Sequence, residues 1–216
     1  MVKEDENFLR VTLLLLQGGT LVSKETLKIE VKKSGKNIDV LLKPFENKLF
    51  NKTVKRQREK LFPQGSTGTN IEVWDIAMLV TVLLTVFKNS LDDDQKDHLN
   101  TIKRIRDEVF AHSHSSSLSN DEYDDIRGEL EKAYMSLSSS IGNDKISECD
   151  DIINKCTNDP ISREDLKKHL ENQEDLFQIV LYKMNEHDKK LLEMKDGSIF
   201  SFCSFLTFFL NFKFDD

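Results

Sequence analysis

An all-α fold is predicted by three features of the sequence. Only 3 Pro and 8 Gly interrupt its 216 residues, so long helices form more readily than many short strands. Apolar residues return at helical spacing along most of the chain. A hydrophobic content of 38% and a charged content of 32% suit one buried core with well-solvated helix faces. We therefore expect a helical bundle.

The first fifty residues are predicted to contain two helical regions. Residues 8–16 are strongly apolar, and Gly18-Gly19 would stop this first helix because glycine reaches the left-handed conformation at little cost. Between residues 23 and 50, apolar positions again follow helical steps. Breaks are predicted near Gly35 and at Pro44, which suits a helix start.

The chain is most basic between residues 43 and 60, where seven Lys or Arg accompany two Glu. Such a stretch is either a solvated helix face or a contact for RNA phosphates. The candidate RNA-binding residues within it are Lys52, Lys55, Arg56 and Arg58. Pro and Gly in the segment 61–68 then end the helix.

Residues 72–87 are nearly all apolar and are predicted to form the central helix of the bundle. The run is shorter than the about 20 apolar residues of a membrane span. It also opens with Glu72 and Asp75, so burial in a core suits it better. Asp92-Asp93-Asp94 would supply the acidic first turn of the next helix, where the helix dipole favours negative charge.

A Ser-rich loop at residues 113–119 precedes a helix predicted from Asn120 to about residue 137. A capping-box pattern at Ser162 begins a further, C-terminal amphipathic helix. We therefore expect a helical domain at residues 5–142 and a helical extension at residues 143–196. A hydrophobic tail with seven Phe, expected to be docked or unstructured, follows at residues 197–216.

Composition excludes several classes of function. The net charge of −7 repels nucleic acid at long range, so RNA binding needs a local basic patch, and DNA is not an expected partner. The cysteines Cys149, Cys156 and Cys203 form no CxxC pair and have no His at zinc spacing. We expect reduced thiols in a cytoplasmic protein, with no metal site, no cofactor, no secretion signal and no membrane anchor.

Arg106 and His112 form the one pair on which chemistry can be built, because an imidazole beside a permanent cation can cleave a phosphodiester without metal. Arg163 and His169 repeat the spacing, so spacing alone decides nothing. Arg163, however, lies in the first turn of its predicted helix, whereas Arg106 and His112 lie at the end of their predicted helix. Positions six apart lie about 120° apart around a continuous helix. The pair therefore needs a helix end or a second protomer related by a two-fold axis.

Four landmarks occur in order along the chain, and together they are more specific than any one of them. They are Leu13-Leu14-Leu15-Leu16-Gln17-Gly18-Gly19-Thr20, Leu61-Phe62-Pro63, Val73-Trp74-Asp75-Ile76, and Arg106-Asp107 followed by His112. This order resembles the HEPN family. More narrowly, it resembles the branch found in the DAZ-interacting, RING-type ubiquitin ligase and in many invertebrate immune-like proteins. The resemblance covers about residues 8–141.

The resemblance implies antiparallel helices, a homodimer formed through the motif-bearing helices, and, in catalytic members, metal-independent RNA cleavage. It assigns His112 as the general base on the ribose 2′-hydroxyl. Arg106 would stabilise charge on the phosphate, and Asp107 would orient the pair. The implied products are a cyclic phosphate and a 5′-hydroxyl.

Two functions remain open at this stage. The chain is either a dimeric RNA endonuclease or RNA-binding module for single-stranded RNA, or a noncatalytic interaction and oligomerisation module of an innate-defence or ubiquitin-linked signalling protein. In the second case, protein partners would dock through the C-terminal helix. An exposed, concave setting for Arg106 and His112 would favour the first function, and burial of His112 would favour the second.

Overall fold

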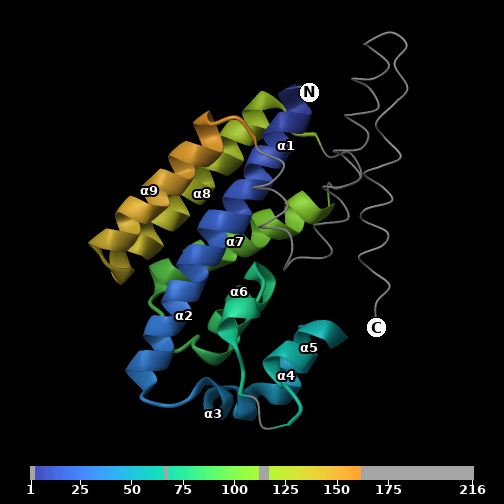
Figure 1. Cartoon of the computed structure of the whole chain (residues 1–216), viewed down its shortest axis with the longest axis vertical. Helices are drawn as coiled ribbons and strands as arrows, with labels where there is room; N and C mark the ends of the chain where they lie inside the picture. The colour runs from blue at the N-terminus through green and yellow to red at the C-terminus, as the bar shows by residue number, and fades with distance from the viewer. Residues whose placement is uncertain (1–2, 66–67, 112–116, 162–216) are drawn as a thin grey trace.

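The computed structural model describes residues 3–65, 68–111 and 117–161, and within these ranges the chain forms a helical bundle without strands (Figure 1). The predicted all-α class is confirmed. The predicted helix after Ser162, the Phe-rich tail and Cys203 lie outside the described residues. The helices are α1 (Lys3–Leu14), α2 (Thr20–Ser34), α3 (Ile38–Leu42), α4 (Glu46–Phe50), α5 (Lys55–Leu61), α6 (Ile76–Val86), α7 (Asp93–Ala111), α8 (Asn120–Ile141) and α9 (Asn143–Asn158).

The predicted helix stop at Gly18-Gly19 is wrong, because α1 and α2 are joined by a π-helical segment, Leu15–Gly19, into one long rod (Figure 1). These glycines are needed for close packing. A Cβ on Gly18 would lie 2.5 Å from Cε2 of Tyr134, and a Cβ on Gly19 would lie 2.5 Å from Cδ1 of Ile76. The ring of Tyr134, on α8, therefore rests directly on the rod's backbone.

Tyr134 is fully buried, and its hydroxyl donates a hydrogen bond to the carbonyl of Leu14 at 3.1 Å. The hydroxyl thus has a partner, as a buried polar group requires. Burial raises the pKa of Tyr134 well above its usual range. The ring and its hydrogen bond fix α8 against the N-terminal rod.

The hairpin of α8 and α9 packs along α1 (Figure 1). Residues 143–158 lie within the predicted helical extension and form α9, in which Cys149, Ile153 and Cys156 share one buried stripe. Both cysteines in this stripe are buried thiols. Arg10 of α1 donates to the carbonyls of Cys156 at 2.7 Å and Asp159 at 3.0 Å, which ties the end of α9 to the rod.

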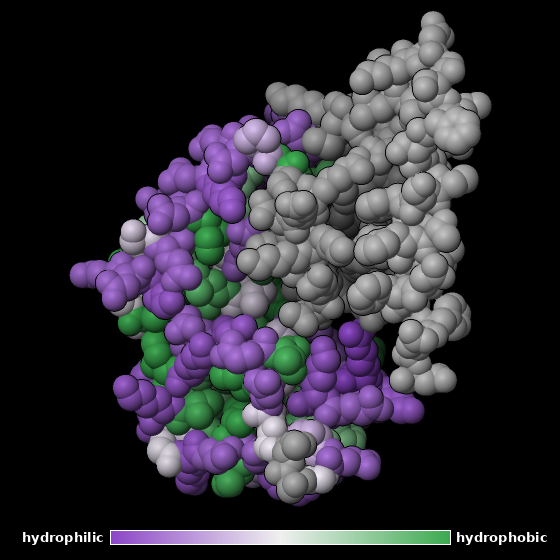
Figure 2. Space-filling view, viewed as in Figure 1, coloured by the Kyte–Doolittle hydropathy of each residue, from purple (hydrophilic) through white to green (hydrophobic). Residues whose placement is uncertain are grey.

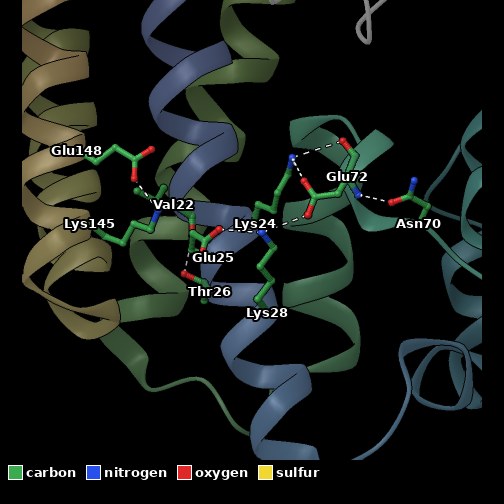
Figure 3. Close-up of polar contacts among 9 residues, drawn as sticks. All are labelled: Val22, Lys24, Glu25, Thr26, Lys28, Asn70, Glu72, Lys145 and Glu148. Atoms are coloured by element: carbon green, nitrogen blue, oxygen red, sulfur yellow. Dashed lines mark hydrogen bonds and ion pairs between the residues drawn. The ribbon is translucent and has the colours of Figure 1, made fainter.

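A short 3-10 turn, Ile71–Val73, leads the chain into the central helix α6 and is held against α2 (Figure 3). Lys24 and Lys28 of α2 lie 3.1 and 3.2 Å from the two carboxylate oxygens of Glu72. The hydrogen bonds from these lysines lower the pKa of Glu72. This contact fixes where α6 enters the bundle.

The central helix begins at Ile76, a few residues later than predicted, because Asp75 caps it. Oδ1 of Asp75 accepts a hydrogen bond from the backbone N–H of Met78 at 2.8 Å, and Oδ2 accepts one from the side chain of Gln57 at 3.1 Å. The second bond connects α5 to the start of α6. The basic stretch is thereby held close to the central helix.

Candidate functional site

Arg106 and Asp107 lie near the end of α7, as the sequence predicted. One face of α7 is buried in the core through Leu99, Ile102, Ile105 and Val109. The opposite, polar face carries Lys96, Asn100, Lys103 and Asp107 at steps of four, three and four residues. These positions share one stripe of the helix, so their side chains project toward the same side.

The guanidinium of Arg106 donates through Nη1 to Oδ1 of Asp107 at 2.8 Å. The ammonium of Lys103 lies 3.6 Å from the other carboxylate oxygen, Oδ2. Asp107 is therefore shared by two cations, and it fixes the orientation of Arg106, whose side chain is 25% exposed. His112, the third residue of the predicted site, lies outside the described residues.

Arg106 and Asp107 line an open hollow of about 470 Å³, which we call the Arg106 hollow. Lys52 lines it too, from the turn between α4 and α5, so the most basic stretch of the sequence meets the predicted catalytic arginine here. The remaining lining residues come from that turn and from α5, α6 and α7: Asn51, Thr53, Val54, Gln57, Ile76, Ala77, Val80, Thr81, Ile102 and Lys103.

The other three predicted RNA-binding residues lie on α5 and do not line this hollow. Lys55 and Arg56 are exposed, and hydrophilic side chains cover the surface over α5 (Figure 2). Arg58 donates to the carbonyl of Thr53 at 3.0 Å, and its guanidinium carbon lies 5.4 Å from the centre of the Phe50 ring. Arg58 therefore holds the turn that positions Lys52.

A second hollow of about 480 Å³ adjoins the first and shares Lys52, Thr81 and Lys103 with it. We call it the lysine hollow, because four of its lining residues are lysines. Its lining residues are Lys52, Thr81, Leu84, Thr85, Lys88, Lys96, Asn100 and Lys103.

Lys52 lies between the two hollows, and its ammonium donates to the buried hydroxyl of Thr85 at 3.2 Å. Burial lowers the pKa of Lys52, and the neighbouring charges of Lys48, Lys103 and Lys88 lower it further. The site is thus a region of concentrated positive charge in a chain whose net charge is −7. Such a region attracts anions.

Within residues 3–65, 68–111 and 117–161, no group of three or more His, Cys, Asp or Glu is placed to hold a metal ion. The helices described in those ranges include none long and apolar enough to cross a membrane. Among the described residues that line the two hollows, the polar side chains are cations and neutral hydrogen-bonding groups, apart from the carboxylate of Asp107. That set suits the binding of phosphate groups.

No curated protein and no solved structure matches the chain. A family model, described as DZIP3/hRUL138-like HEPN, matches residues 24–165, well over half of the 216 residues. The matched range begins within α2, includes α3 to α9 and contains Arg106, Asp107 and His112. The chain therefore belongs to the DZIP3/hRUL138-like HEPN family.

Proposed function

We propose that this HEPN domain binds single-stranded RNA at the Arg106 hollow and cleaves it there without a metal ion, in the cytoplasm. One observation carries the proposal: Arg106 lines the same hollow as Lys52, which comes from the most basic stretch of the chain. A guanidinium and an ammonium group from distant segments thus face one open space. A phosphodiester is the ligand in RNA that such a pair binds best.

Each group has a definite role in the proposed reaction. The 2′-oxygen of the ribose loses its proton to His112, attacks the adjacent phosphorus and forms a cyclic phosphate. The bond from phosphorus to the 5′-oxygen breaks, and that oxygen takes a proton from water and leaves as a 5′-hydroxyl, while His112 returns its proton to the solvent. Arg106 stabilises the negative charge that builds up on the phosphate oxygens. Asp107, 2.8 Å from the Arg106 guanidinium, holds it in place.

A homodimer is part of the proposal, because the two-fold axis would bring two copies of Arg106 and His112 to one cleft. Size-exclusion chromatography with light scattering tests it. Twice the mass of one 25.0 kDa chain is expected. A strict monomer would contradict the composite site.

A noncatalytic interaction module is the second candidate function, for a protein of innate defence or ubiquitin-linked signalling. The ion pair between Arg106 and Asp107 favours it, because the carboxylate satisfies part of the guanidinium within the chain itself. The C-terminal helix predicted to dock protein partners lies outside the described residues.

Incubation of the wild-type chain with labelled single-stranded RNA in excess EDTA separates the two candidates. Cleavage is expected to continue in the chelator and to leave cyclic phosphate and 5′-hydroxyl ends, which enzymatic end analysis identifies. RNA bound but left intact would contradict the cleavage step and leave RNA binding in place. A chain that neither binds nor cleaves the RNA would contradict the whole proposal.

A further inference from the structure

The lysine hollow is lined by an excess of positive charge. Among the described residues that line it, four are lysines and none is acidic. Two of these lysines have carboxylate neighbours outside the hollow: Lys96 lies 3.0 Å from Asp93, and Lys103 lies 3.6 Å from Asp107. Within the described part of the chain, Lys52 and Lys88 form no ion pair.

The ammonium groups that line the lysine hollow repel one another. The pKa of Lys52 is lowered by burial and by the charges of Lys48, Lys103 and Lys88. A bound anion would remove this repulsion. Because the chain as a whole is acidic, the local excess of lysine points to an anionic ligand rather than to general surface charge.

The two hollows are continuous, because Lys52, Thr81 and Lys103 line both. From Lys96 to Arg106, α7 runs through ten residues, or about 15 Å at 1.5 Å per residue. A free phosphate or a single nucleotide would fill one hollow only. A strand that carries a phosphate at every nucleotide can fill both.

We propose that the lysine hollow binds the backbone phosphates of the RNA strand next to the phosphate held at Arg106. This inference rests on the proposed function and adds the path of the strand: from Arg106, past Lys103 and Lys52, to Lys96 and Lys88. Lysine contacts to phosphate carry no base information. The track therefore binds RNA independently of its sequence and sets the register of the strand over the site.

The test measures how RNA affinity depends on salt for the double variant Lys88→Gln/Lys96→Gln. The probe is a labelled 12-nucleotide 2′-O-methyl oligouridine, which lacks the 2′-hydroxyl that cleavage needs. Each phosphate contact with a single strand contributes about 0.7 to the slope of log affinity against log salt. Loss of two contacts should reduce the slope by about 1.4. The single variant Lys88→Gln should reduce it by about 0.7 and leaves the contact of Lys96 with Asp93 intact.

The matched control is Lys36→Gln/Lys145→Gln, which removes the same charge from residues that line neither hollow. Its slope should equal that of the wild type. An equal reduction of the salt slope in the two double variants would overturn the track, because only net charge would then matter. Inorganic tripolyphosphate provides a second test. If it displaces the oligonucleotide and binds with the same affinity as the oligonucleotide, the track is wrong, since the hollow would then be a site for a free anion.

Failure of the track can be told from failure of the proposed function. If Lys88→Gln/Lys96→Gln binds like the wild type while Arg106→Gln loses RNA, the track is wrong and RNA binding at Arg106 stands. If the double variant shows a smaller slope of log affinity against log salt but the wild type cleaves no RNA in EDTA, the track stands and the cleavage step fails. Absence of RNA binding by the wild type overturns both.

Discussion

Replacing His112 with alanine should reduce the rate of RNA cleavage by about 10²–10⁴-fold, the usual contribution of a general acid or base. Replacing Arg106 with glutamine should reduce it by about 10²–10³-fold, the usual cost of removing one donor to a developing negative charge. Both losses should appear in single-turnover rates measured in EDTA with excess protein. RNA affinity should change little in His112→Ala, which removes no contact to phosphate in the proposed mechanism.

The matched control for Arg106→Gln is Arg127→Gln on α8. Arg127 has a similar side-chain exposure, 31% against 25%, pairs with Glu131 at 2.8 Å, and lines neither hollow. Its cleavage rate should remain near that of the wild type. Undiminished cleavage by His112→Ala would eliminate the proposed general base. Equal losses in the two arginine variants would show that Arg106 acts only through net charge.

Replacing Gly18 with alanine should destabilise the fold by about 1–3 kcal/mol, the usual cost of overpacking a core. The added Cβ would lie 2.5 Å from Cε2 of Tyr134, and the ring is fully buried and held by its hydrogen bond to Leu14. The ring or the rod must therefore shift. The midpoint of thermal unfolding should fall by several degrees, as followed by circular dichroism.

Gly128 provides the control, because it lies within α8 and a Cβ there would have no atom within 4 Å. Gly128→Ala should stabilise the chain by about 0.5–1 kcal/mol, the ordinary gain from replacing glycine inside a helix. The two substitutions are chemically identical and should act in opposite directions. A gain in stability from Gly18→Ala would contradict the close packing of Tyr134 on the rod.

Gly18 and Gly19 also show where prediction from the sequence failed. Local rules favour a helix stop at paired glycines, but the glycines are there because Tyr134 and Ile76, far along the chain, approach the backbone. No local pattern contains that contact. The helices α6 and α8 were predicted well because their own residues carry the signal: α6 is an almost unbroken apolar run, and α8 has apolar residues at helical spacing.

The bounds of α9 were not predicted within the helical extension at residues 143–196, because its buried stripe includes two cysteines, which were interpreted only as thiols. The spacing of Cys149, Ile153 and Cys156 was the signal that could have revealed them. Cysteine packs as a small hydrophobic residue. Counting it as apolar would have extended the helical pattern to residue 156.

Three of the residues that line the Arg106 hollow were named from the sequence. Arg106 and Asp107 were chosen from their order among the family landmarks, and Lys52 was chosen because its segment is basic. The sequence analysis did not select the other three lysines of the site, Lys88, Lys96 and Lys103. They are spread along the sequence and meet only when α6 packs against α7. The spacing of Lys96, Asn100 and Lys103 does predict that they share one face of α7.

The most direct measurement of the central claim, that RNA lies along the Arg106 and lysine hollows, is a map of amide chemical shifts. The ¹⁵N-labelled chain would be titrated with the uncleavable 2′-O-methyl oligouridine. The largest changes are predicted at residues 51–54, 81–88 and 100–107, which contribute most of the lining of the two hollows. Changes centred instead on the outer face of the α8–α9 hairpin, with none at these three segments, would contradict the account.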